Sequence, residues 1–116
     1  MMTLLEIEEF AKKTFGNTPF SVRQINFTTI RISVGTDTLI DIFQSVRDPK
    51  KFAFHAKLFD GGIYRLDCRP EKKYMKLATF PWHFHDGSEE HVVVSPFATT
   101  AQNALQQFLR YIKKRI

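Results

Sequence analysis

The sequence contains a single cysteine, Cys68, among 116 residues. One thiol cannot form an intramolecular disulfide or a cysteine-based zinc cluster, so nothing requires an oxidising compartment. Glycine and proline are scarce, at five residues each, which excludes collagen-like and low-complexity chains. No apolar run approaches the ~18 residues of a membrane span, and Glu6 interrupts the N-terminus before a signal-peptide core can form. We therefore expect a cytoplasmic protein that is neither exported nor inserted into a membrane.

The residues that are abundant are typical of one globular domain over positions 1–116. Hydrophobic residues make up 43% of the chain and charged residues 25%, and twelve Phe supply large side chains for a core. Lysine and arginine number 17 against 12 acidic residues, which gives a net charge of +5. This excess favours an anionic partner such as RNA, but a solvated basic surface explains it equally well.

Helical spacing of apolar residues appears near both ends of the sequence. Over residues 3–15, Thr3 and Glu6 are placed as a capping box, and Gly16 follows as a C-terminal stop. A second helix near the C-terminus is predicted to be capped by Thr99 with Gln102. Its apolar stripe comprises Ala101, Ala104, Leu105, Phe108, Leu109 and Ile112.

Between the two helices, apolar and polar residues alternate as they do in strands. We predict one strand from about residue 24 to 34, a second over 38–44, a hairpin over 52–68, an extended segment over 82–85 and a short strand over 91–94. A helix, a run of antiparallel strands and a helix together predict an α+β domain. Both helices are expected to cover one face of the sheet, which leaves the other face for function or for a partner.

The register of the hairpin over 52–68 can be predicted from its loop. A three-residue loop at Asp60–Gly62 keeps apolar residues on one face, because paired residues share a face and glycine supplies the left-handed conformation. This register places Lys57 opposite Arg65 and His55 opposite Asp67, with Arg69 close by. One face of the hairpin is therefore predicted to carry basic and titratable side chains.

The first candidate chemistry on this face is metal-independent RNA cleavage, which needs no cofactor. It requires a base for the 2′-hydroxyl, an acid for the leaving oxygen and a cation for the phosphorane. His55, Arg65 and an orienting Asp67 have these properties, and either His83 or His85 is the second acid–base group. The contacts to RNA phosphates are assigned to Lys57, Arg65 and Arg69. The alternative is that Asp67 forms an exposed ion pair with Arg65 or Arg69.

The second candidate chemistry is metal binding by the histidine-rich tract. His83 and His85 share a face of the extended segment, and with His91 they have the ligand type for a divalent metal. The alternative is that these histidines are solvated or structural. Because Trp82 and Phe84 are expected to turn inward, both imidazoles of the tract are predicted on the wetter side, where truncation costs under ~0.5 kcal/mol.

Three segments, Phe52–His55, Asp60–Asp67 and Phe80–Ser88, resemble the TumE-like toxin family. The resemblance spans about residues 50–95 and departs from the family at Cys68, where asparagine is expected, and over 71–73, where relatives often carry histidines. It implies the toxin half of a type II toxin–antitoxin pair that acts on RNA and is neutralised by an antitoxin, usually of helix-turn-helix type. The resemblance also implies a set of candidate site residues, although it assigns no role to any of them: His55, Arg65, Asp67, His83 and His85.

Two functions from different classes are therefore predicted. The first is a toxin that cleaves or binds RNA and is neutralised by a protein partner. The second is a non-enzymatic regulatory module whose histidine tract binds a metal or a partner. Whether the chain forms a homodimer is left open.

Overall fold

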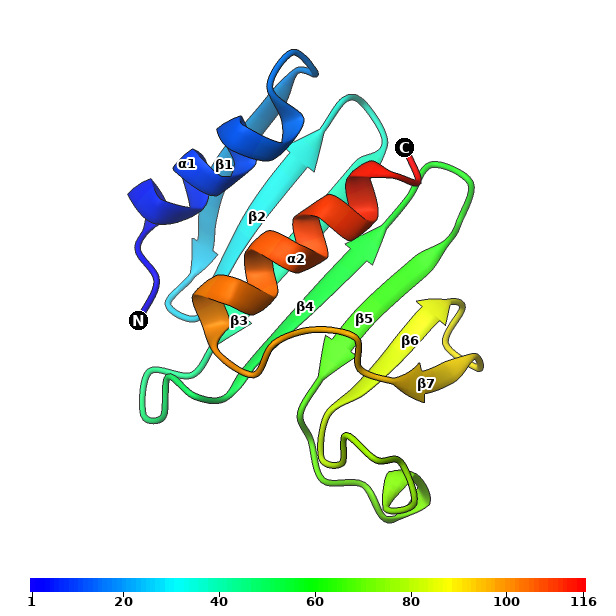
Figure 1. The fold of residues 1–116 in the computed structure, drawn as a ribbon. Coiled ribbons are helices and arrows are strands. Elements are labelled where there is room, and N and C mark those ends of the chain that lie inside the picture. Colours follow the sequence, from blue (N-terminus) through cyan, green and yellow to red (C-terminus); the bar gives the residue numbers. More distant parts are fainter.

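The computed structural model describes all residues, 1–116, and confirms the α+β fold. Seven strands form one antiparallel sheet in which each strand pairs with its neighbours in the sequence, β1 to β7 (Figure 1). The elements are α1 (Leu4–Phe15), β1 (Phe20–Asn26), β2 (Thr29–Val34), β3 (Thr38–Gln44), β4 (Phe52–Lys57), β5 (Ile63–Asp67), the 3₁₀ turn η1 (Lys72–Tyr74), β6 (His83–Gly87), β7 (Val92–Val94) and α2 (Ala101–Lys113). None of the helices is long and apolar enough to span a membrane.

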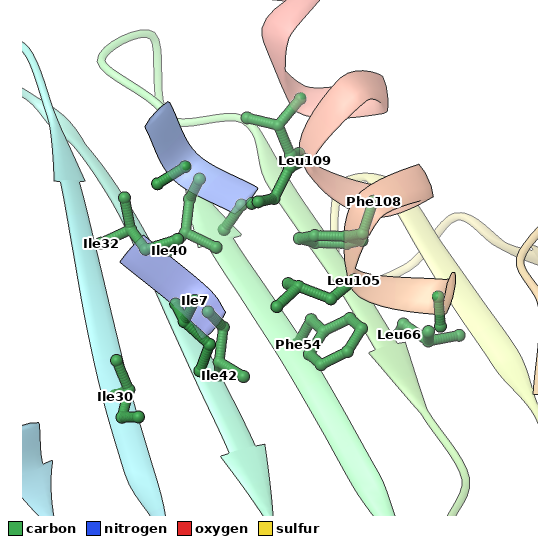
Figure 2. Packing of buried hydrophobic residues seen from close by; sticks show 14 of the residues in the cluster. Ile7, Ile30, Ile32, Ile40, Ile42, Phe54, Leu66, Leu105, Phe108 and Leu109 are labelled. Atoms are coloured by element: carbon green, nitrogen blue, oxygen red, sulfur yellow. The ribbon is translucent and has the colours of Figure 1, made fainter. Parts of the chain in front are cut away.

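Both helices lie on the same face of the sheet, as the sequence predicts (Figure 1). Alternation along the strands turns one apolar row toward the helices, and Figure 2 shows this row meeting apolar side chains of α1 and α2. Each fully buried Ile, Leu or Phe contributes about 1.5–3 kcal/mol relative to an exposed position. The residues of this core include Ile7, Ile30, Ile32, Ile40, Ile42, Phe54, Leu66, Leu105, Phe108 and Leu109.

The helix boundaries are partly as predicted. At the start of α1, Thr3 and Glu6 form the capping box, and the Gly16 N–H donates to the Lys12 carbonyl at the other end. The predicted cap of α2 is wrong, since Thr100 is its N-cap residue and makes no side-chain capping bond. Gln107, within α2, accepts the N–H of Ala98 at 2.7 Å through Oε1 and so holds the segment that leads into the helix.

The predicted strand over residues 24–34 is wrong, because the chain forms two strands there. β1 and β2 make a hairpin that turns at Phe27 and Thr28, and β1 begins earlier, at Phe20. β1 is one of the two edge strands, and most of its side chains are exposed on both faces. An edge strand with little burial lacks the apolar alternation from which strands are predicted.

The predicted register of the β4–β5 hairpin is also wrong: the loop lies one residue earlier than predicted, so each β4 residue pairs two positions away from its predicted partner. The loop has three residues, but they are Phe59–Gly61, and Gly61 takes the positive φ of +85°. The Asp60 carboxylate accepts the Gly62 N–H at 2.8 Å, which stabilises this turn. His55 therefore pairs with Arg65 instead of Asp67, and Lys57 pairs with Ile63. Because both registers keep the same faces together, the apolar face is as predicted.

The face opposite the helices, called the open face below, is covered at one end. The connection over residues 70–82, which contains η1, packs against β6 through the Tyr74 ring. Over β3 and β4 the face is open, and Leu39 and Phe43 are exposed there. The open face therefore has an uncovered part, where apolar and polar side chains are exposed, and a part that the connection covers.

Candidate functional site

Five polar side chains form a row across the middle of the open face, called the polar row below. In order from β2 to β6 they are Arg31, Asp41, His55, Arg65 and His85, each paired in register with the next. Directly paired residues share a face and have Cβ atoms ~4.5–5.5 Å apart. The antiparallel meander therefore brings together residues that are up to 54 positions apart in the sequence.

Arg65 makes two polar contacts at the covered end of the polar row. Its Nη2 lies 2.9 Å from a carboxylate oxygen of Glu89 and donates to His85 Nε2 at 3.1 Å. Nε of Arg65 is buried without a partner. Since both protein contacts use Nη2, Nη1 has no protein acceptor and can bind an anion from outside.

His85 is held by hydrogen bonds at both ring nitrogens. Its Nδ1 lies 2.8 Å from the Glu89 carbonyl oxygen, an acceptor, so this nitrogen carries the proton. Nε2 is then unprotonated, and its lone pair accepts a hydrogen bond from the Arg65 guanidinium. A buried imidazole with both nitrogens engaged orients Arg65 and is not free to exchange protons with a substrate.

His55 differs from His85 because its imidazole is exposed and makes no hydrogen bond or ion pair within the protein. Desolvation by the surrounding side chains and, second, the positive charge of Arg65 lower the pKa of His55 below the usual 6.5. A lowered pKa keeps the ring neutral at pH 7. His55 therefore presents an accessible lone pair beside the Arg65 guanidinium.

Asp41, the other neighbour of His55, is paired with Arg31, and its charge only partly offsets the lowering of the His55 pKa. The two side chains form a bidentate pair, with Arg31 Nε and Nη2 at 2.7 Å and 3.0 Å from the two carboxylate oxygens. Hydrogen bonding and charge attraction in this pair raise the pKa of Arg31. Because the two charges cancel, the end of the polar row formed by this pair has no net charge.

Asp67 and His83 belong to the neighbouring row, where they pair with each other in register. The Asp67 carboxylate accepts the Arg69 N–H at 2.9 Å and so stabilises the bend that follows β5. The prediction that Asp67 lies opposite His55 is therefore wrong. The three residues assigned to RNA phosphates do not share one row: Lys57 lies one level from Arg65, whereas Arg69 lies beyond the end of β5, with Asp67 between it and Arg65.

The predicted exposure of His83 and His85 is wrong as well, since both side chains are buried. They lie on the expected face, opposite Phe84, but Tyr74 covers them: its ring centroid is 4.3 Å from that of His83 and 6.3 Å from that of His85. His91 stays exposed. No group of three or more His, Cys, Asp or Glu side chains is placed to hold a metal, so the proposed ligand set of His83, His85 and His91 is not assembled.

A hollow of about 470 Å³ opens beside Arg65. Its walls come from the connection after β5 and from the β6–β7 loop, and they include Glu71, Tyr74, His85 and Glu89. Sequence reasoning missed Tyr74 and the Arg31–Asp41 pair as parts of the site. A signal for Tyr74 was available, because it is the aromatic residue in segment 71–76, whose other residues except Met75 are charged.

A comparison with protein-family models matches residues 5–116 to the family described as Toxin TumE. The chain belongs to this family. The match extends beyond the segment over 50–95 that carries the resemblance in sequence, and it includes both helices. No curated protein and no solved structure matches the chain. As a member of the TumE family the chain is a toxin component, and the polar row is the candidate site of this TumE toxin.

Proposed function

We propose that this TumE-family toxin cleaves RNA without a metal and that a partner antitoxin neutralises it. The observation that carries the proposal is the pairing of His55 with Arg65 in the polar row. His55 offers an accessible imidazole with a lowered pKa, and Arg65 offers a guanidinium oriented by Glu89 and His85. Family membership supports the toxin role independently of this geometry.

In the proposed reaction, His55 takes the proton of a ribose 2′-hydroxyl. The 2′-oxygen forms a bond to the adjacent phosphorus, and the bond from phosphorus to the 5′-oxygen breaks. The 5′-oxygen leaves with a proton from solvent, because His85 has no free nitrogen with which to act as the acid. A positioned general base contributes about 10²–10⁴-fold to such a step.

Arg65 supplies the charge stabilisation that the reaction needs. The phosphorane carries more negative charge on its oxygens than the phosphate does, so a cation held in place beforehand favours the transition state. Glu89 and His85 hold Nη2 and leave Nη1 to the phosphate. Lys57, on β4, and Arg69, beyond the end of β5, are exposed on either side of this position and are assigned to neighbouring phosphates.

The experiment compares His55→Ala with the matched control His91→Ala, which removes an equally exposed imidazole outside the polar row. Each protein is incubated with a generic RNA with and without a chelator, and its melting temperature is recorded. We expect His55→Ala to lose about 10²–10⁴-fold in rate at an unchanged melting temperature, with wild type and His91→Ala fully active in chelator. Full activity of His55→Ala, or loss of wild-type cleavage in chelator, contradicts the proposal.

A further inference from the structure

A basic groove lies between α1 and α2, on the helical side of the molecule. The two helices run side by side in the same direction across that face of the sheet (Figure 1). The groove has a volume of about 440 Å³ and is on the opposite side of the sheet from the polar row. Its lining residues are Phe10, Lys13, Thr14, Gln106, Arg110, Lys113 and Lys114.

The charge of the groove is not balanced within the protein. Four of its seven lining residues are cationic and none is acidic. Carboxylates within ion-pair distance are found only at Arg31, Arg65, Lys73 and His85, so all four groove cations are unpaired. An adjoining hollow, which shares Gln106 and Arg110, is also lined without a carboxylate.

Helix stability explains only part of this arrangement. Lys13, Arg110 and Lys113 lie in the last turns of their helices, where each cation gains about 0.3–1 kcal/mol from the helix dipole. Gathering four like charges around one groove costs mutual repulsion, which the dipoles do not require. An anionic ligand in the groove relieves that repulsion.

The floor of the groove is apolar, and this distinguishes between anionic ligands. Phe10 is half-buried and packs against the core, and the Thr14 hydroxyl already donates to the Phe10 carbonyl at 2.8 Å. The floor therefore offers apolar contact and no free donor from Thr14. Single-stranded RNA stacks successive bases on several aromatic rings, and this groove has only the half-buried ring of Phe10, whereas a peptide can place one apolar side chain there and carboxylates at the cationic rim.

We propose that this groove docks an acidic, amphipathic peptide segment of the partner antitoxin. The proposal rests on the proposed function in one respect, the existence of a neutralising protein partner. The groove itself recognises the chemistry of the segment, alternating carboxylates and apolar side chains. Docking there leaves the polar row on the other side of the sheet free of this contact.

The test uses the full chain and a short labelled peptide of glutamates and leucines, with the same peptide carrying Gln for Glu as its control. The groove variant is Lys13→Gln, Arg110→Gln and Lys113→Gln combined. The matched control combines Arg47→Gln, Lys50→Gln and Lys51→Gln, which removes one arginine and two lysines from the exposed connection between β3 and β4. All six side chains are exposed, so both variants should fold as wild type does.

We expect the groove variant to bind the acidic peptide about tenfold more weakly, which corresponds to roughly 0.5 kcal/mol per lost ion pair. The control variant should change the dissociation constant by less than about twofold, because the removed charges lie elsewhere. Equal losses in the two variants, or equal binding of the Gln peptide, overturn the proposal. The proposal is also overturned if the groove variant loses binding only to a labelled oligoribonucleotide and not to the acidic peptide, since the groove would then be an RNA site.

RNA cleavage separates the two proposals. The groove variant should cleave RNA at the wild-type rate, because no groove residue belongs to the polar row. If wild type binds the acidic peptide through the groove but cleaves no RNA, the proposed nuclease function fails and the groove proposal stands. If cleavage depends on His55 and the peptide does not bind, the groove proposal fails alone.

Discussion

Two histidines in the polar row have opposite roles because of their hydrogen bonds. His85 is buried with both ring nitrogens bonded, so it orients Arg65. His55 is exposed with neither nitrogen bonded, so it can accept a proton from a substrate. The two residues are of the same type, so only their hydrogen-bond partners distinguish their roles.

The lowered pKa of His55 predicts the pH dependence of RNA cleavage. The base must be deprotonated, so the rate should fall as the pH decreases through the pKa of His55 and be constant above it. The half-maximal rate should lie below pH 6.5, because desolvation and Arg65 disfavour the charged ring. A pH–rate profile measured on generic RNA checks this expectation. A bell-shaped profile would contradict it, since it requires a second titrating group that acts as the acid.

The burial of His83 predicts a cost for its removal. His83→Ala should lower the free energy of unfolding by about 1–3 kcal/mol, because it leaves a void beneath the Tyr74 ring. Urea denaturation measures this change, and His91→Ala is the exposed control, expected within about 0.5 kcal/mol of wild type. Equal stabilities of the two variants would mean that the Tyr74 connection does not cover His83 in solution.

Among the elements, α2 is tied to β6 by one polar contact. The Tyr111 hydroxyl of α2 donates to the Asp86 carboxylate of β6 at 2.6 Å. Burial and, second, this hydrogen bond raise the pKa of Tyr111 to about 12. The Arg115 guanidinium lies 3.4 Å from the Tyr111 ring centroid. This contact links the C-terminal helix to the strand that carries His83 and His85.

Tyr111→Phe should lower the free energy of unfolding by about 1–2 kcal/mol, because Asp86 loses its donor while the ring packing is kept. The matched control is Tyr64→Phe, since Tyr64 belongs to the same aromatic cluster and its hydroxyl makes no hydrogen bond. Urea denaturation of both variants provides the comparison. If the two variants are equally stable, the bond to Asp86 adds nothing to the fold.

Taken together, the two sides of the sheet present different surfaces. The helical side carries the basic groove with its unpaired cations. The open side carries the polar row, in which Arg31 and Arg65 are each paired with a carboxylate. The four groove cations thus have no carboxylate partner, whereas both arginines of the polar row have one. Binding of RNA to the open side should then depend on a few local cations.

The salt dependence of RNA binding measures how many cations take part. Three phosphate contacts, by Lys57, Arg65 and Arg69, predict a log–log slope of about −2, since each contact to a single strand contributes about −0.7. Filter binding over a range of ionic strengths gives the slope. Lys57→Gln should make it shallower by about 0.7, whereas Lys50→Gln should leave it unchanged. Undetectable binding at low salt would contradict an RNA site on this face.

The order of elements and the face on which each strand residue lies were predictable from local patterns. The period of two assigned His55 and Arg65 to the face opposite Phe54 and Leu66, and the capping box at Thr3 located the start of α1. β1 was missed because its side chains are mostly exposed on both faces, which removes the alternation. The hairpin loop was placed one residue too late, which shifted the pairing by two residues, because both three-residue loops satisfy the same apolar pattern.

Neighbours distant in sequence determine the rest of the site. Alternation predicts on which face His83 and His85 lie, but not whether another segment covers that face. Tyr74 covers them from the connection before β6, and Glu89 reaches Arg65 from the loop after it. The period of a strand is set by its own backbone geometry, which the sequence contains locally. Burial, hydrogen-bond partners and pKa shifts depend on segments brought together by folding, and they alone distinguish His55, the proposed base, from His85, which is bonded to Arg65.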